Sequence, residues 1–372
     1  MPCFLSLSVK CLIYGDRRTA LNLIVYTPDQ FEALRKAASQ IKGNYSLHHR
    51  PFVDYYYASR DWCKLYLFLS PAGGVVGLVG VERMPFEFDS QPFTLGFGTN
   101  FHALQHGIGG LLFMQWVRSS GLALEYGGTE DAHRIIRQQR WTYFPGVRIY
   151  TLNHDYPVYP NDRVHRRAGK WILRHSSRKR ISGYAARASA LARNLVTVAE
   201  ESTFSGDLLP SQSPFRFRFV PTIEYLAWRY NLKLSFATYR LFRILSRGRS
   251  AGYVIINESV DRLLVAQCDG EDAETLACGV ILSILEVGKQ DAFPRTVLLT
   301  CSHPVMAEAY MKFGFKQGKN DYPMAIGGLG KKVDIPADTA NWLVNFDWGD
   351  NGLLGPFLDQ KDESSKHSQV RP

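Results

Sequence analysis

The strongest constraint on the fold is that the chain carries one succession of predicted elements twice. The first copy opens with LNLIVYTPDQFEAL (Leu21–Leu34), a strand followed by a helix that Thr27 and Gln30 would cap as a capping box. The second copy opens with NLVTVAEESTFSGDL (Asn194–Leu208). An aromatic block follows in each copy, at Arg50–Tyr57 and at Pro221–Tyr230. A repeat this long indicates a duplicated domain and not a solenoid.

After the aromatic block, each copy continues with a predicted hairpin and then alternates strands with helices. In the first copy the hairpin, strand, helix, strand and helix are Trp62–Glu82, Phe93–Gly98, Ile108–Ser120, Leu122–Tyr126 and Asp131–Gln139. In the second copy they are Tyr239–Asn257, Arg262–Gln267, Ala273–Val287, Thr296–Cys301 and Val305–Phe313. This alternation predicts the α/β class, with a mixed, mostly antiparallel sheet flanked by helices in each copy.

The length of 372 residues suits two domains with one core each. We expect an N-terminal extension (1–20), a first domain (21–151), a basic linker (152–193), a second domain (194–357) and a disordered tail (358–372). The composition, with 45% hydrophobic and 21% charged residues, is ordinary for a soluble globular protein. No apolar stretch reaches the roughly 18 residues needed to cross a bilayer.

The six cysteines are scattered, and none forms a C-x-x-C pair, so neither structural zinc nor redox chemistry is expected. His102 and His106 have the spacing of two ligands on one helix face. Gly107 and Gly109 argue against a helix there, and no nearby carboxylate completes a site, so no metal is predicted. Reduced thiols and the lack of a clear signal peptide favour a cytoplasmic protein.

Three glycines, Gly107, Gly109 and Gly110, stand at the start of the predicted helix Ile108–Ser120. Each lowers helix stability by roughly 1 kcal/mol relative to alanine. A helix start offers unpaired N–H groups and a partial positive charge, and glycines let a phosphate approach them closely. The alternative is a tight strand-to-helix turn with close packing. The spacing fits neither the Rossmann nor the Walker phosphate-binding pattern.

The segment Leu104–Gly110 resembles the acyl-CoA loop of the GNAT superfamily, the Gcn5-related N-acetyltransferases, whose pattern is [QR]-x-x-G-x-[GA]. Gly107 and Gly109 match the two small positions, whereas Leu104 replaces the Gln or Arg and Gln105 comes one place late. Gly127–Phe144 is similar to the next strand-to-helix passage, with Ile136 at the tyrosine position. In the second copy, Ala307–Phe315 is similar to the closing motif, with Tyr310 in register.

The resemblance implies two tandem GNAT-like domains and an acyl-CoA-dependent N-acyltransferase. Acetyl-CoA would bind at Leu104, Gln105, His106, Gly107, Ile108, Gly109 and Gly110. His102 and Glu125 are candidate bases for an amine acceptor, such as an amino sugar of a cell-surface polysaccharide. Tyr310 matches the position that protonates the departing thiolate, but it lies in the copy without the glycine loop, and core packing is the alternative. Two alternatives remain: an aminoacyl-tRNA-dependent transferase, and an inactive pair that acts as a binding scaffold.

The second copy would be degenerate, because Glu271 and Asp272 stand where a pyrophosphate would lie and like charges repel. We therefore expect acyl-CoA to bind the first copy only, with the second copy shaping the acceptor cleft. The two copies are expected to pack together.

Much of the net charge of +10 lies between the copies. The cations there are Arg163, Arg166, Arg167, Lys170, Arg174, Arg178, Lys179, Arg180, Arg187 and Arg193. Trp171, Ile172 and Leu173 interrupt them, and aromatic and apolar residues among cations suit an anionic membrane or a lipid-linked saccharide. The linker is therefore expected to dock on an anionic surface or polymer. A solvated helical face is the simpler alternative.

Overall fold

The computed structural model describes residues 8–9, 21–41, 46–128, 130–152, 195–259, 262–289, 295–329, 334–336 and 338–348. The cation cluster Arg163–Arg193 and the tail 358–372 lie outside the described residues, so the expectations for them stay predictions. Below, the first half means residues 21–152 and the second half means residues 195–348.

The described elements contain the succession that the repeat predicts, together with helices in both aromatic blocks and further strands that were not predicted. Those up to the end of the first half are β1 (Ser8–Val9), β2 (Leu21–Val25), η1 (Pro28–Gln30), α1 (Phe31–Ala38), η2 (Ser46–His48), α2 (Arg50–Ala58), β3 (Cys63–Leu69), β4 (Val75–Phe88), β5 (Gln91–Ala103), α3 (Ile108–Ser120), β6 (Ala123–Tyr126), α4 (Glu130–Gln138) and β7 (Thr142–Leu152). Those of the second half are β8 (Val196–Glu201), η3 (Gly206–Leu208), β9 (Phe217–Phe219), α6 (Ile223–Arg229), β10 (Thr238–Ser246), β11 (Arg249–Glu258), β12 (Arg262–Gly270), α7 (Ala273–Lys289), β13 (Thr296–Cys301), α8 (Pro304–Phe313) and β14 (Lys316–Gly327). The capping box forms as expected, since the backbone N–H of Thr27 donates to Gln30 Oε1 at 3.0 Å.

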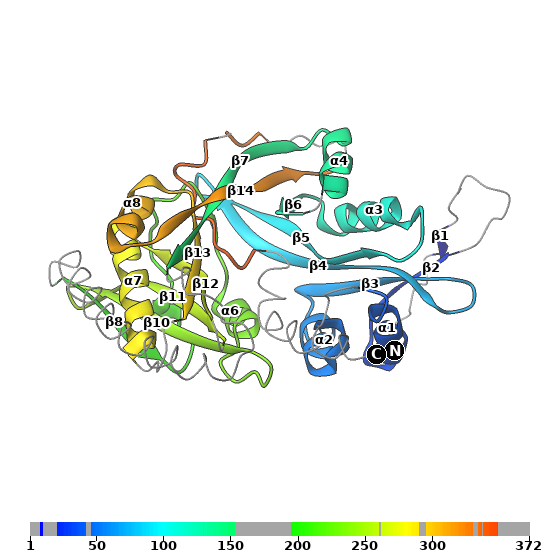
Figure 1. Cartoon of the computed structure of the whole chain (residues 1–372), viewed down its shortest axis with the longest axis horizontal. Helices are drawn as coiled ribbons and strands as arrows, with labels where there is room; N and C mark the ends of the chain where they lie inside the picture. Colours follow the sequence, from blue (N-terminus) through cyan, green and yellow to red (C-terminus); the bar gives the residue numbers. More distant parts are fainter. Residues whose placement is uncertain are drawn as a thin grey trace, which may run out of the picture.

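The strands form one 14-stranded sheet in the order β1-β2-β3-β4-β5-β6-β14-β7-β13-β12-β11-β10-β8, with β9 paired to β4 outside this path. Among the described pairings between named strands, β5–β6 and β12–β13 are parallel and the others are antiparallel. The last strands of the two halves are exchanged: β14 lies between β6 and β7, and β7 lies between β14 and β13. Figure 1 shows both strands running from one half into the other.

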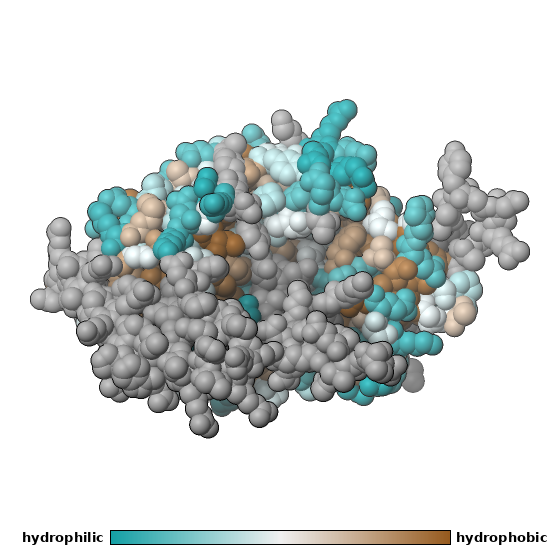
Figure 2. Space-filling model, viewed as in Figure 1, coloured by the Kyte–Doolittle hydropathy of each residue, from teal (hydrophilic) through white to brown (hydrophobic). Residues whose placement is uncertain are grey.

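Helices cover both faces of the sheet (Figure 1). In the first half, α3 and α4 pack on a core that includes Ile108, Leu112 and Ile136, while α7 and α8 cover a separate core in the second half. The close approach of α3 depends on glycine, because a Cβ on Gly98 would lie 2.9 Å from the ring of Trp116. The outer face of α4 is hydrophilic in Figure 2, in keeping with the exposed ion pair Arg134–Asp131.

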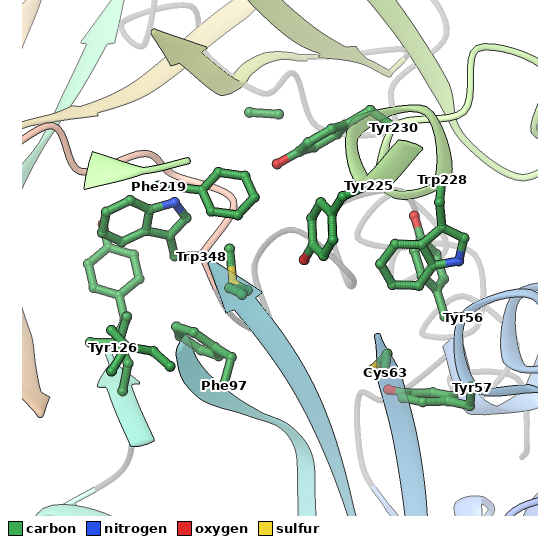
Figure 3. Packing of buried hydrophobic residues seen from close by; sticks show 14 of the residues in the cluster. Tyr56, Tyr57, Cys63, Phe97, Tyr126, Phe219, Tyr225, Trp228, Tyr230 and Trp348 are labelled. Carbon is green, nitrogen blue, oxygen red and sulfur yellow. The ribbon is translucent and has the colours of Figure 1, made fainter. Parts of the chain in front are cut away.

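A third core joins the two halves. It contains side chains from α2 and β3 of the first half and from α6, β10 and β11 of the second. Figure 3 shows Tyr56 beside Trp228, with Trp348 in the same cluster as Phe97 and Tyr126. Because this core contains side chains of both copies, the hydrophobic effect stabilises the packing of the two halves against each other.

Candidate active site

A cavity opens where two parallel strands of the first half separate. β5 and β6 pair at Gly96–Ala123 and Phe97–Leu124 and no further. Beyond that point lies a cavity of about 1010 Å³. Its walls come from the carboxyl ends of these strands, the glycine loop, α3, α4 and Pro323 of β14. Strand exchange thus brings a residue of the second half into the site.

The register between β4 and β5 shifts at the edge of this cavity. Leu78 pairs with His102 and Gly80 with Thr99, so Asn100 and Phe101 stand opposite a single residue, as in a β-bulge. Asn100 has a φ of +48° and donates its side-chain amide to Tyr57 Oη of α2 at 2.6 Å. The bulge changes which side chains face α3, and Phe101 and Ala103 line the cavity.

The glycine loop begins where β5 ends, with the N–H of Leu104 bonded to the carbonyl of Val76 at 3.0 Å. Gly107 is the N-cap of α3 with a φ of +84°, and no side chain caps this helix. A Cβ on Gly110 would meet open space, and one on Gly109 would make only ordinary contact with Ala103. Close packing therefore accounts for neither glycine of the helix, which favours the explanation that a ligand approaches the backbone.

The candidate binding residues surround this opening. Leu104, Gln105, His106, Gly107 and Gly109 line the cavity. Ile108 is buried in the core beneath α3, and Gly110 is exposed in the first turn of the helix.

Glu125 of β6 also lines the cavity. Gly128 makes room for it, since a Cβ there would collide with the Glu125 carboxylate. His133 of α4 holds the adjoining loop: its Nε2 bonds to the carbonyl of Gly127 and its Nδ1 to Tyr143 Oη at 3.0 Å. Of the candidate bases, Glu125 is the one placed in the cavity wall.

The other two candidate catalytic residues are not among the residues that line the cavity. His102 is half-buried on β5, and burial lowers its pKa to about 4, so it is neutral and a weak base at neutral pH. Tyr310 of α8 is buried in the core of the second half against Tyr150 and Phe315, and burial raises its pKa well above the usual value. The structure does not bring Tyr310 to the cavity.

Among the described residues of the second half, the corresponding helix start is closed. There the helix start is capped by the chain itself, because Asp272 Oδ1 accepts the N–H of Thr275 at 2.7 Å. Glu271 accepts a hydrogen bond from Ser211 at 3.0 Å. A carboxylate thus takes the place that a phosphate could take in the first half, in keeping with the expectation of one donor site.

A buried ionic centre between the halves was missed by the sequence analysis. Arg229 Nε lies 2.8 Å from Glu82 Oε1, and its Nη2 lies 3.8 Å from Asp347 Oδ2. All three side chains are at most 1% exposed. Burial raises the pKa of Asp347 to about 7, and the charge of Glu82 also raises it, while Arg229 lowers it without offsetting the burial. The available signal was Glu82 at the end of the apolar run VVGLVGVE and Arg229 within the aromatic run EYLAWRY.

The fold is that of the GNAT acyltransferases, as the solved structures with similar architecture show. A probable N-acyltransferase of unknown function from Enterococcus faecalis superposes with a TM-score of 0.54 at 9% identity, over 84% of this chain and 73% of that one. A GCN5-related N-acetyltransferase from Anabaena variabilis gives 0.52 at 10% identity, over 82% and 72%. Saccharomyces cerevisiae N-myristoyltransferase gives 0.51 at 9% identity, over 90% and 86%.

The sequence matches no protein-family profile and no curated protein. At such low identities the structural likeness defines the fold alone. It confirms the prediction of two GNAT-like units with mixed strand pairing and flanking helices, although the strands of the two units join in one continuous sheet.

Proposed function

We propose that the chain is an acyl-CoA-dependent N-acyltransferase with one donor site, in the first half. The observation that carries this is an uncapped, glycine-bearing start of α3 at a cavity between two separating parallel strands. The N–H groups and the helix dipole there would hold a pyrophosphate. The cavity, at about 1010 Å³, is large enough for the arm that carries the thioester.

In this proposal acetyl-CoA is the donor, and an amine, such as an amino sugar of a cell-surface polysaccharide, is the acceptor. Glu125 would accept the proton that the amine loses, directly or through water, and the nitrogen would then attack the thioester carbonyl. The register shift at Asn100 and Phe101 is the place in β5 where a backbone N–H could stabilise the developing oxyanion. The departing thiolate would take its proton from water, because Tyr310 is remote.

The binding test is calorimetric titration of acetyl-CoA into the wild type and the variant Gly109→Val. Gly109 lines the cavity, and an added Cβ would make only ordinary contact with Ala103. We expect affinity to fall at least about tenfold. Gly288→Val is the matched control, since Gly288 is a helical glycine of α7 with open space around its Cβ. A folded Gly109→Val protein that binds as well as wild type would refute the site.

Turnover separates an enzyme from a binding scaffold. Release of the CoA thiol would be followed with a panel of amino sugars and simple amines, in wild type and in Glu125→Gln. We expect the variant to bind acetyl-CoA normally and to lose most of its rate. Binding of acetyl-CoA without release of the CoA thiol in the presence of any amine would favour the binding scaffold. Leu104 at the position of the usual Gln or Arg supports the same alternative.

A further inference from the structure

The gap between β12 and β13 in the second half corresponds to the donor cavity of the first. These parallel strands pair over Arg262–Leu264 and Thr296–Leu298 and then part, as β5 and β6 do. In the second half, however, the space beyond the last pair is filled by residues 342–348, here named the C-terminal segment.

The C-terminal segment bonds to both separating strands. On the β12 side, the N–H of Asp347 donates to the carbonyl of Ala266 at 3.2 Å. Asn345 makes two bonds to the backbone of Cys268: its Oδ1 accepts the N–H at 3.0 Å and its Nδ2 donates to the carbonyl at 3.2 Å. The amide side chain therefore satisfies backbone groups that no neighbouring strand reaches.

On the β13 side, two hydroxyl groups hold the backbone of the segment. Thr300 Oγ1 donates to the carbonyl of Val344 at 3.1 Å, and Ser302 Oγ donates to that of Trp342 at 2.9 Å. β9 completes the cleft, because Leu343 N–H donates to the carbonyl of Phe217 at 2.9 Å. Every residue from Trp342 to Trp348 is at most 9% exposed.

We propose that the gap between β12 and β13 is a peptide-binding cleft whose ligand is the chain's own C-terminal segment. One backbone bond to β12, together with side-chain bonds on both sides, holds the segment where an acyl-CoA arm would lie in the first half. The segment keeps the second half closed to a donor, together with Asp272 at the start of α7. This inference stands whether or not the first half transfers acyl groups.

The bound segment also supports the first half. Trp348 packs against Phe86 with ring centroids 4.9 Å apart and lies 6.4 Å from Tyr126, which lines the donor cavity. Asp347 reaches Arg229 of the buried ionic centre. Occupation of the second cleft is thereby connected to the wall of the first.

Cys268 reports directly on the cleft, because Asn345 Oδ1 also accepts a hydrogen bond from its thiol at 3.3 Å. The experiment is native-state alkylation of the full-length chain with iodoacetamide, with each cysteine quantified by peptide mass spectrometry. Asn345→Ala should raise the labelling rate of Cys268 about tenfold. Cys63, buried in the first half, should not change.

Asn257→Ala is the matched control, a buried asparagine of the same half that bonds to the carbonyl of Thr238 instead. The inference is overturned if Asn345→Ala labels Cys268 no faster than this control. It is overturned equally if the labelling rate of Cys63 rises in parallel, because the segment would then be released only when the whole protein unfolds. Saturation of the wild type by two acetyl-CoA molecules would also refute a closed second cleft.

Discussion

At the scale of single residues, the least predictable feature is the ionic centre of Glu82, Arg229 and Asp347. A buried charge is costly unless it is paired, and two carboxylates here share one guanidinium. The strand that carries Glu82 was predicted as part of a hairpin, whereas Arg229 was noted only as part of the aromatic block Pro221–Tyr230 and lies on α6 in the structure. Their pairing required the two halves to meet.

Asp347 should make stability depend on pH. Its pKa is raised from 3.8 to about 7 on folding, so the folded state holds a proton that the unfolded state releases. The resulting stability is present below about pH 4 and is lost as pH rises to 7, by up to about 1.4 kcal/mol per pH unit. Urea unfolding of Asp347→Asn between pH 5 and 7 should show a correspondingly weaker dependence than wild type.

Glu286→Gln is a suitable control for this measurement, because Glu286 forms an exposed pair with Lys289 on α7. Its slope should equal that of wild type. An unaltered slope in Asp347→Asn would mean that Asp347 is ionised throughout this range.

At the scale of elements, a glycine in α3 lowers the stability of the helix but leaves room for a ligand, and the two effects can be measured separately. Gly110→Ala should raise the free energy of unfolding by about 0.5–1 kcal/mol, because alanine is the better helix former and its Cβ meets open space. We expect the same change to weaken acetyl-CoA binding. A variant that is more stable and binds normally would show that Gly110 has no part in the donor site.

Gly98→Ala should have the opposite effect on stability. Its Cβ would press on the Trp116 ring of the same helix and cost about 1–3 kcal/mol. Chemical denaturation of both variants beside wild type measures the contrast. Equal effects of the two substitutions would contradict the close docking of α3 on β5.

At the scale of the whole molecule, the exchange of β7 and β14 joins the two halves. Each half completes its sheet with a strand of the other, and the central core contains side chains of both. We expect one cooperative unfolding transition, with coincident curves from circular dichroism and tryptophan fluorescence. Two separate transitions would show that the halves fold independently.

The basic linker carries a second prediction at this scale. Sedimentation with anionic liposomes and a tRNA gel shift, each at low and moderate salt, test its docking on an anionic surface or polymer. We expect retention by liposomes that weakens with salt. Retention by tRNA alone would favour the aminoacyl-tRNA-dependent alternative, and retention by neither would leave a solvated face. No helix among the described residues is long and apolar enough to cross a membrane.

The sequence by itself determined the repeat, most of the elements and the glycine loop, because these are properties of local periodicity and turn chemistry. The helix predicted at Ile108–Ser120 is α3 with the same bounds. The strand predicted at Phe93–Gly98 continues to Ala103 in the structure. The prediction ended too early because glycine and the bulge at Asn100 interrupt the alternating sequence pattern.

Only the tertiary structure decided how the two copies join. The exchanged strands β7 and β14 were not predicted, because both contain proline and glycine and β14 begins with a polar run, KQGKND. Their strand character comes from neighbours far away in the sequence. The filling of the second cleft is likewise a long-range event, since the backbone groups that Asn345 satisfies on Cys268 belong to a strand whose own parallel partner has turned away.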